Sequence, residues 1–192
     1  MLVKGHDFPD VTLVVVLFAD GLFRFPDFRA NERSYQTLLQ VAGRSGRGEK
    51  KGKVLIQTFE PEHPIFSVLK GEISEEAFLE DEKEMRKALL YPPYGRIARL
   101  RIEANDKEEA MRLSTELKSI FDSLHRSDSG DAFEALGPSE AFLEKAKGIF
   151  RWDLMLKSAS IGKLHSFIGV AKKWAESKEV SLLVDVDPYG VG

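Results

Sequence analysis

A glutamine and two arginines at helical spacing are the residues of this chain best suited to chemistry. Gln40 precedes Arg44 by four residues, Arg47 follows three later, and each arginine comes directly after a glycine. Because residues three apart lie on one face of a helix, both guanidinium groups can reach one polyanion. Guanidinium groups neutralise the charge that spreads over a phosphoryl group during its transfer. The spacing therefore predicts contact with the γ-phosphate of a nucleotide; the alternative is a solvated basic turn.

The loop that would hold the phosphates is missing from the sequence. No Gly-x-x-x-x-Gly-Lys-Ser/Thr pattern, whose backbone cradles phosphates, occurs in the 192 residues. The chain thus has the arginines of a phosphoryl-transfer site without its phosphate-binding loop.

The composition is that of an ordinary soluble globular protein, with 43% hydrophobic and 31% charged residues. The absence of cysteine excludes disulfides and thiolate metal sites, and the four histidines are scattered, so no metal site is predicted. The longest apolar run, residues 11–19, is about half as long as a transmembrane helix requires. The first residues do not resemble an export signal. We therefore expect a cytoplasmic location and no membrane contact.

The net charge of −3 is unevenly distributed along the chain. Residues 1–58 carry nine Lys/Arg and six Asp/Glu (+3), residues 59–90 four and nine (−5), and residues 91–192 fifteen and sixteen (−1). Binding to nucleic acid would therefore have to come from local patches rather than from bulk charge.

The elements expected to position the arginines form half of a parallel α/β unit. Residues 11–19 are a continuous apolar run, typical of a strand buried on both faces. Asn31 is a suitable N-cap for a helix ending near Ala42. Residues 53–59 form a second strand of the buried type, so the order is strand, helix, strand.

Residues 59–93 are predicted to be a helical linker. A short helix is expected at 63–70 and an acidic helix from Ser74 to about Leu90. The Pro- and Gly-containing sequence at 91–95 ends the acidic helix and marks the domain boundary.

Residues 94–192 have the pattern of a second, α+β domain. Residues 97–104 alternate apolar and charged side chains, as in a half-exposed strand, and Asp106 caps a helix extending to about Leu124. Strands at 133–142 and 148–157 are joined as a hairpin at 144–147, and a helix at 162–177 and a strand at 180–186 follow. The order β-α-β-β-α-β is that of the split, ferredoxin-like arrangement.

The hairpin combines basic and aromatic residues, which suits single-stranded DNA. Lys145 and Lys147 can follow phosphates, and Arg151 or Trp152 can stack on a base. Strand alternation places Phe150 and Trp152 on one face of the sheet and Arg151 on the other. If the face of Trp152 packs on the helices, Trp152 belongs to the core and cannot stack, so both interpretations stay open.

The last helix has a basic side. It is either an ordinary solvated face or a seat for an acidic peptide. Its residues are Lys157, Lys163, His165, Lys172 and Lys173.

Several motifs, taken in order, resemble one known family. Residues 4–12 resemble motif V of superfamily 2 helicases, and residues 40–47 resemble motif VI. Pro-Glu-His-Pro, Tyr-Pro-Pro, Leu-Gly-Pro, Phe-Arg-Trp and Asp-Val-Asp-Pro then follow at residues 61–64, 91–93, 136–138, 150–152 and 185–188. Together they resemble the C-terminal part of the primosomal replication-restart DNA helicases, over essentially the whole chain.

The resemblance implies that the chain is the C-terminal part of a longer ATP-dependent 3′-to-5′ DNA helicase. Residues 1–58 would form the end of its second RecA-like lobe, and residues 94–192 would form a domain that binds DNA and partners. Residues 59–93 would be the helical linker between these two parts. Arg44 and Arg47 would contact the γ-phosphate, and the nucleotide would be bound by Gly5, Asp7 and Gln40. ATP, Mg²⁺ and zinc would be bound by the parent protein, and none of them by this piece alone.

The partners that the resemblance implies are DNA forks, single-stranded DNA, other primosome proteins and the acidic tail of single-stranded DNA-binding protein. The piece alone is expected not to hydrolyse ATP. Residues 1–58, with exposed strand edges and apolar faces, are expected to be partly disordered, remodelled, or buried against a second copy by self-association. The alternatives are a self-standing binding module with a vestigial motif VI and a more distant helicase relative.

Overall fold

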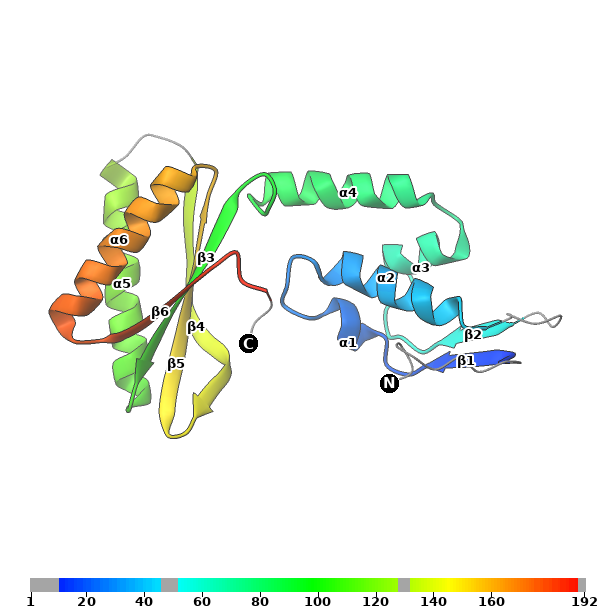
Figure 1. Cartoon of the computed structure of the whole chain (residues 1–192), viewed down its shortest axis with the longest axis horizontal. Coiled ribbons are helices and arrows are strands. Elements are labelled where there is room, and N and C mark those ends of the chain that lie inside the picture. The colour runs from blue at the N-terminus through cyan, green and yellow to red at the C-terminus, as the bar shows by residue number, and fades with distance from the viewer. Residues whose placement is uncertain (1–10, 46–51, 128–131, 190–192) are drawn as a thin grey trace. The chain divides into compact units, whose positions relative to one another are not determined.

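The computed structural model describes residues 11–45, 52–127 and 132–189, which form two compact units (Figure 1). The units are Met1–Glu84 and Met85–Gly192, so the division falls within helix α4 (Glu75–Ala88) rather than at the Pro-rich sequence after it.

The first unit has the predicted strand-helix-strand order. Its other elements are β1 (Leu13–Val16), α1 (Asp20–Phe23), α2 (Ala30–Ala42), β2 (Lys53–Ile56) and α3 (Pro64–Lys70). β1 and β2 pair in parallel, with Leu13 opposite Lys53. Both strands are shorter than predicted, and the short helix α1 lies between β1 and α2.

Helices cover only one face of the β1–β2 sheet within the described residues. Val16 and Ile56 pack on a core that includes Tyr35, Leu38 and Phe78. On the opposite face Leu13, Val15 and Leu55 are about half exposed. The prediction of a strand buried on both faces is therefore wrong for the chain as described.

Residues that were expected to form a linker contribute to the first unit. Ile65, Phe66 and Phe78 lie in its core. Asn31 was predicted to cap α2, but α2 begins at Ala30, and the side chain of Asn31 donates a hydrogen bond of 2.8 Å to Glu82 Oε1. This bond ties α2 to α4.

The second unit has the predicted β-α-β-β-α-β order. Its elements are β3 (Arg96–Ala104), α5 (Lys107–Ser127), β4 (Phe133–Ala146), β5 (Ile149–Ser158), α6 (Ile161–Lys178) and β6 (Ser181–Val186). The strands form an antiparallel sheet in the order β4-β5-β3-β6, and α5 and α6 pack on one of its faces (Figure 1).

Alternation along β3 determines what each face of this sheet carries. Ala98, Leu100 and Ile102 point into the helix-covered core, so the charged residues between them lie on the outer face. The predicted cap of α5 is confirmed, because Asp106 Oδ1 accepts a hydrogen bond of 2.9 Å from the backbone N–H of Glu109.

The β4–β5 hairpin is longer and less regular than predicted. β4 continues to Ala146, and the turn consists of Lys147 and Gly148, whose φ angles of 52° and 86° suit a two-residue hairpin turn. Glu140 lies opposite Trp152, whereas Lys145 lies opposite Phe150. Residues 141–144 therefore lie opposite a single residue of β5 and form an irregular bulge, larger than the usual two-against-one kind.

Candidate nucleotide and nucleic-acid sites

Two of the residues predicted to contact the nucleotide lie at the carboxyl end of α2. Gln40 is exposed in the last turn of the helix, and the backbone N–H of Arg44 donates to Val41 O (3.1 Å) in the turn that follows. Gly5, Asp7 and Arg47 lie outside the described residues. The structure thus brings Gln40 and Arg44 within one turn of each other.

Two of the predicted DNA-binding residues lie at the end of the β4–β5 hairpin. Lys145 and Lys147 are both exposed. The ammonium group of Lys145 lies 4.3 Å from the centroid of the Phe150 ring, within cation–π range. Lys147 is the first of the two turn residues, both of which have a left-handed backbone conformation.

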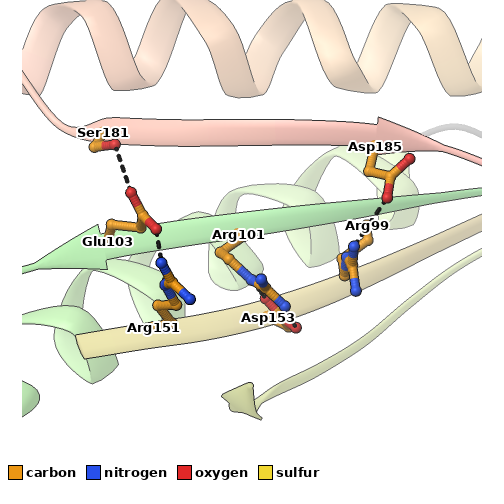
Figure 2. A network of polar contacts seen from close by, with 7 residues as sticks. All are labelled: Arg99, Arg101, Glu103, Arg151, Asp153, Ser181 and Asp185. Carbon is orange, nitrogen blue, oxygen red and sulfur yellow. Dashed lines mark hydrogen bonds and ion pairs between the residues drawn. The ribbon is translucent and has the colours of Figure 1, made fainter. Parts of the chain in front are cut away.

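Arg151 takes part in a set of cross-strand ion pairs on the outer face of the sheet (Figure 2). Its Nε donates to Glu103 Oε1 at 2.9 Å, and Glu103 Oε2 accepts from Ser181 at 3.4 Å. Both partners lie directly opposite Glu103 in the sheet register. A phosphate would therefore have to compete with Glu103 for Arg151.

Two further arginines of β3 are paired in the same way (Figure 2). Arg101 makes two hydrogen bonds to Asp153, of 2.8 and 3.0 Å, and these raise the pKa of Arg101 above its usual range. Arg99 donates to Asp185 at 2.9 Å. These pairs match three guanidinium groups with three carboxylates, so the charge of this network is balanced.

Trp152 belongs to the buried side of the sheet. It is 9% exposed and shares its strand face with Leu154 and Leu156, which lie in the core. The structure therefore places Trp152 in the core. The alternative interpretation, in which this side chain stacks on a base, is wrong. The Nε1 atom of Trp152 is buried without a hydrogen-bond partner among the described residues.

The bulge of β4 presents two apolar side chains that the sequence analysis did not select. Phe142 is 72% exposed and Leu143 is 56% exposed. Three consecutive apolar residues, 141–143, interrupt the expected alternation of the strand, and this was the available signal.

One residue predicted for the basic side of the last helix does not lie there. Lys157 is buried on β5, where its Nζ donates to Leu89 O (3.2 Å), pairs with Glu134 (3.2 Å) and lies 4.4 Å from the centre of the Tyr91 ring. It therefore supports the junction between α4 and β3. Lys172, Lys173 and His165 are exposed on α6.

In residues 11–45, 52–127 and 132–189, no group of three or more His, Cys, Asp or Glu could hold a metal ion, and no helix is long and apolar enough to span a membrane.

Comparison with known proteins gives consistent results along the chain. Residues 87–189 match the family of primosomal protein N C-terminal domains. The whole chain is 36% identical over 191 residues to replication restart protein PriA of Synechocystis sp., covering 100% of this chain and 22% of that protein. The PriA proteins of Haemophilus influenzae and Bacillus subtilis are 33% and 34% identical, each over 98% of this chain and 25% and 23% of their own lengths.

The chain thus spans about a quarter of the length of these curated relatives. The match at 87–189 covers more than half of the 192 residues. The chain therefore belongs to the family of primosomal protein N C-terminal domains and is similar along its length to replication restart protein PriA.

Proposed function

We propose that the chain is the C-terminal part of an ATP-dependent 3′-to-5′ DNA helicase that restarts replication and assembles the primosome. The observation that carries this proposal is the similarity to replication restart protein PriA over the whole chain, through both units. Such a protein would act in the cytoplasm on DNA forks, together with single-stranded DNA-binding protein and other primosome proteins.

We infer that the first unit ends a RecA-like lobe and that the second unit is ferredoxin-like. The parallel pairing of β1 with β2 across α2 supports the first inference. The half-exposed face with Leu13 and Leu55 suits a sheet that another layer covers, as in doubly covered α/β folds. The antiparallel order β4-β5-β3-β6, with both helices on one face, supports the second.

In this proposal the first unit completes an ATP site that other segments of the parent protein begin. Gln40 and Arg44 supply an amide and a guanidinium group, which suit phosphate oxygens but offer no carboxylate to Mg²⁺. Mg²⁺ and the β-phosphate would therefore be held by other segments. Zinc would also be held elsewhere, because this chain has no cysteine.

The role of the arginines is tested by substitution in the full-length parent protein. Arg44→Ala and Arg47→Ala should each lower DNA-stimulated ATP turnover by roughly 10³-fold, the lower end of the range for an arginine that stabilises phosphoryl transfer. Arg24→Ala is a matched control, because Arg24 is an exposed arginine of the same unit paired with Glu60. Unchanged turnover in Arg44→Ala and Arg47→Ala would favour the self-standing binding module with a vestigial motif VI.

The chain of 192 residues provides a second test. It should show no DNA-stimulated ATPase activity, because a phosphate-binding loop is absent from its sequence. Turnover by the pure chain would contradict the proposal that it holds only part of the site.

We further propose that the second unit binds single-stranded DNA through the end of the β4–β5 hairpin. Lys145 and Lys147 are exposed there, whereas the arginines of the outer sheet face are matched by carboxylates. The hairpin end is thus the better candidate for phosphate contact. DNA affinity should fall steeply with salt, because phosphate contacts release counterions.

A second candidate function is binding of the acidic tail of single-stranded DNA-binding protein to the basic side of α6. His165, Lys172 and Lys173 are exposed there. Lys172→Glu with Lys173→Glu should weaken binding of an acidic peptide, measured by fluorescence anisotropy, and leave the affinity for single-stranded DNA unchanged. Equal peptide binding by the variant and the original chain would exclude this face as the seat.

A further inference from the structure

The bulge of β4 leaves two large apolar side chains largely exposed, close in sequence to the two exposed lysines of the hairpin. Phe142 is 72% exposed and Leu143 is 56% exposed, whereas their neighbour Ala141 is buried. Bulges redirect side chains that a regular strand would have placed elsewhere. This bulge directs an aromatic ring and a leucine away from the core.

A single lysine at the start of α5 fixes both ends of the bulge. Lys107 Nζ lies 2.7 Å from Glu140 Oε1 and 2.6 Å from Glu144 Oε1. The two glutamates bracket residues 141–143, so the bulge is tied at both sides to one point of the fold. These partly exposed ion pairs restrict the conformations of the bulge, which lowers the entropy cost of ordering it on a ligand.

The charges around the bulge suit a polyanion. Lys107 matches Glu140 and Glu144 as a pair, and Lys145 and Lys147 follow directly along the hairpin. These five side chains comprise three lysines and two glutamates, so the hairpin end together with Lys107 of α5 has a net charge of +1. An apolar protein surface would gain nothing from these lysines, whereas a nucleic acid offers both bases and phosphates.

We infer that Phe142 is the base-stacking residue of the hairpin, in the role for which Trp152 is too deeply buried. Phe142 stacks on an unpaired base, and Lys145 and Lys147 contact neighbouring phosphates. The ligand is single-stranded DNA, because a base must leave its duplex partner to stack on a protein ring. Every base has a π-face, so this contact tolerates any sequence. The inference rests on the proposed DNA binding by the hairpin.

The test is a fluorescence anisotropy titration of the 192-residue chain with a labelled oligothymidylate at several salt concentrations. Phe142→Ala should weaken binding roughly tenfold, as expected for the loss of one stacked base. The slope of log K, the DNA association constant, against log salt concentration should be the same for Phe142→Ala as for the original chain, because no charge is removed. Phe142→Tyr should retain the affinity, and Phe142→Leu should behave as Phe142→Ala.

Two further variants distinguish base stacking by Phe142 from the binding of DNA by the hairpin as a whole. Lys145→Ala with Lys147→Ala should weaken binding and reduce the salt slope by about 0.7 for each lysine. Phe59→Ala removes an exposed phenylalanine of the first unit and should bind as the original chain does.

The outcomes distinguish base stacking by Phe142 from DNA binding by the hairpin. If the lysine variant loses affinity while Phe142→Ala does not, the hairpin binds DNA but the stacking role is wrong. Full affinity of Phe142→Leu would show apolar packing instead of stacking and would also overturn the inference. If the lysine variant binds as tightly as the original chain, or the original chain fails to bind at low salt, the proposed DNA binding by the hairpin fails as well.

Discussion

The indole of Trp152 lies on the helix-covered face of the second sheet, with its Nε1 donor buried and unpartnered among the described residues. A buried donor without an acceptor reduces stability, so the ring contributes through its apolar surface alone. Trp152→Ala should lower the free energy of unfolding by about 3–5 kcal/mol, measured by urea denaturation.

A conservative substitution at the same position provides the control. Trp152→Phe keeps most of the apolar surface and removes the unsatisfied N–H, so its cost should stay below about 1.5 kcal/mol. It should also leave the affinity for single-stranded DNA unchanged. A DNA-binding defect in a stably folded Trp152→Phe variant would contradict a purely structural role.

His63 makes the stability of the first unit depend on pH. Its ring is stacked on Phe23 at 4.2 Å, and its Nδ1 accepts a hydrogen bond from the backbone N–H of Ile65 at the start of α3. Burial lowers the pKa of His63 below its ordinary value of 6.5, although the carboxylates of Glu60, Glu82 and Asp20 act in the opposite direction.

The sign of the effect follows from the lowered pKa. As the pH falls below 6.5, the unfolded chain takes up a proton at His63 before the folded chain does, so the free energy of unfolding decreases. His63→Asn keeps a capping acceptor but removes the titration. Urea denaturation between about pH 7.5 and about pH 5 should show a weaker pH dependence in this variant. Equal pH dependence would assign the effect to other groups.

The junction between α4 and β3 is an element whose geometry depends on one glycine. A Cβ atom at Gly95 would lie 2.4 Å from Leu90 O and 3.2 Å from Ser158 O, which are both backbone atoms. Gly95→Ala should therefore displace the junction and lower the free energy of unfolding by about 2 kcal/mol or more.

Gly169 is the matched control on a helix. A Cβ atom there meets nothing within 4 Å, and the residue lies inside α6. Gly169→Ala should raise the free energy of unfolding by roughly 0.5–1 kcal/mol, because alanine loses less backbone entropy in a helix. The two glycine variants should thus move the urea midpoint in opposite directions. A shift in the same direction would contradict the difference between the crowded position of Gly95 and the open position of Gly169.

Periodicity was sufficient to predict the elements whose pattern is local. The alternation of residues 97–104 indicated both faces of β3, and Asp106 indicated the start of α5. The length of the hairpin and the bulge could not be predicted in the same way. The interrupted alternation at residues 141–143 signals an irregular strand, but the geometry of the bulge also involves ion pairs with Lys107, which is remote from β4 in the sequence.

In the candidate site, too, some features could be predicted from the local sequence and others could not. The lysines of the hairpin could be selected from the sequence because charge and turn position are local properties. The burial of Trp152 follows from which sheet face the helices cover, and the buried position of Lys157 follows from its contacts with Leu89 and Tyr91. Both depend on tertiary packing, which overrides local pattern.

At the scale of the whole chain, the two units differ in how completely they cover their sheets. The second unit has a core between its sheet and two helices, and its outer face is charged. The first unit leaves Leu13, Val15 and Leu55 half exposed on one face of a parallel sheet. Exposed apolar faces of this kind promote association.

We therefore expect the 192-residue chain to self-associate with rising concentration in sedimentation velocity. Leu13→Lys with Leu55→Lys should shift the chain towards the monomer, because charged residues on the bare face oppose pairing. Leu183→Lys is the control, since Leu183 is also half exposed but lies on β6 of the second unit. A chain that remains monomeric at high concentration would disprove this expectation.

The ion pairs on the outer face of the second sheet also act as a check on strand pairing during folding. Arg101 faces Asp153, and Glu103 faces Arg151, in the native register of β3 and β5. A slip of β5 by two residues in one direction would set Arg101 against Arg151, and in the other direction Glu103 against Asp153. A slip by one residue would turn the apolar face outwards. Like-charge repulsion and lost burial thus leave the native alignment as the favoured one, whether or not any ligand is bound.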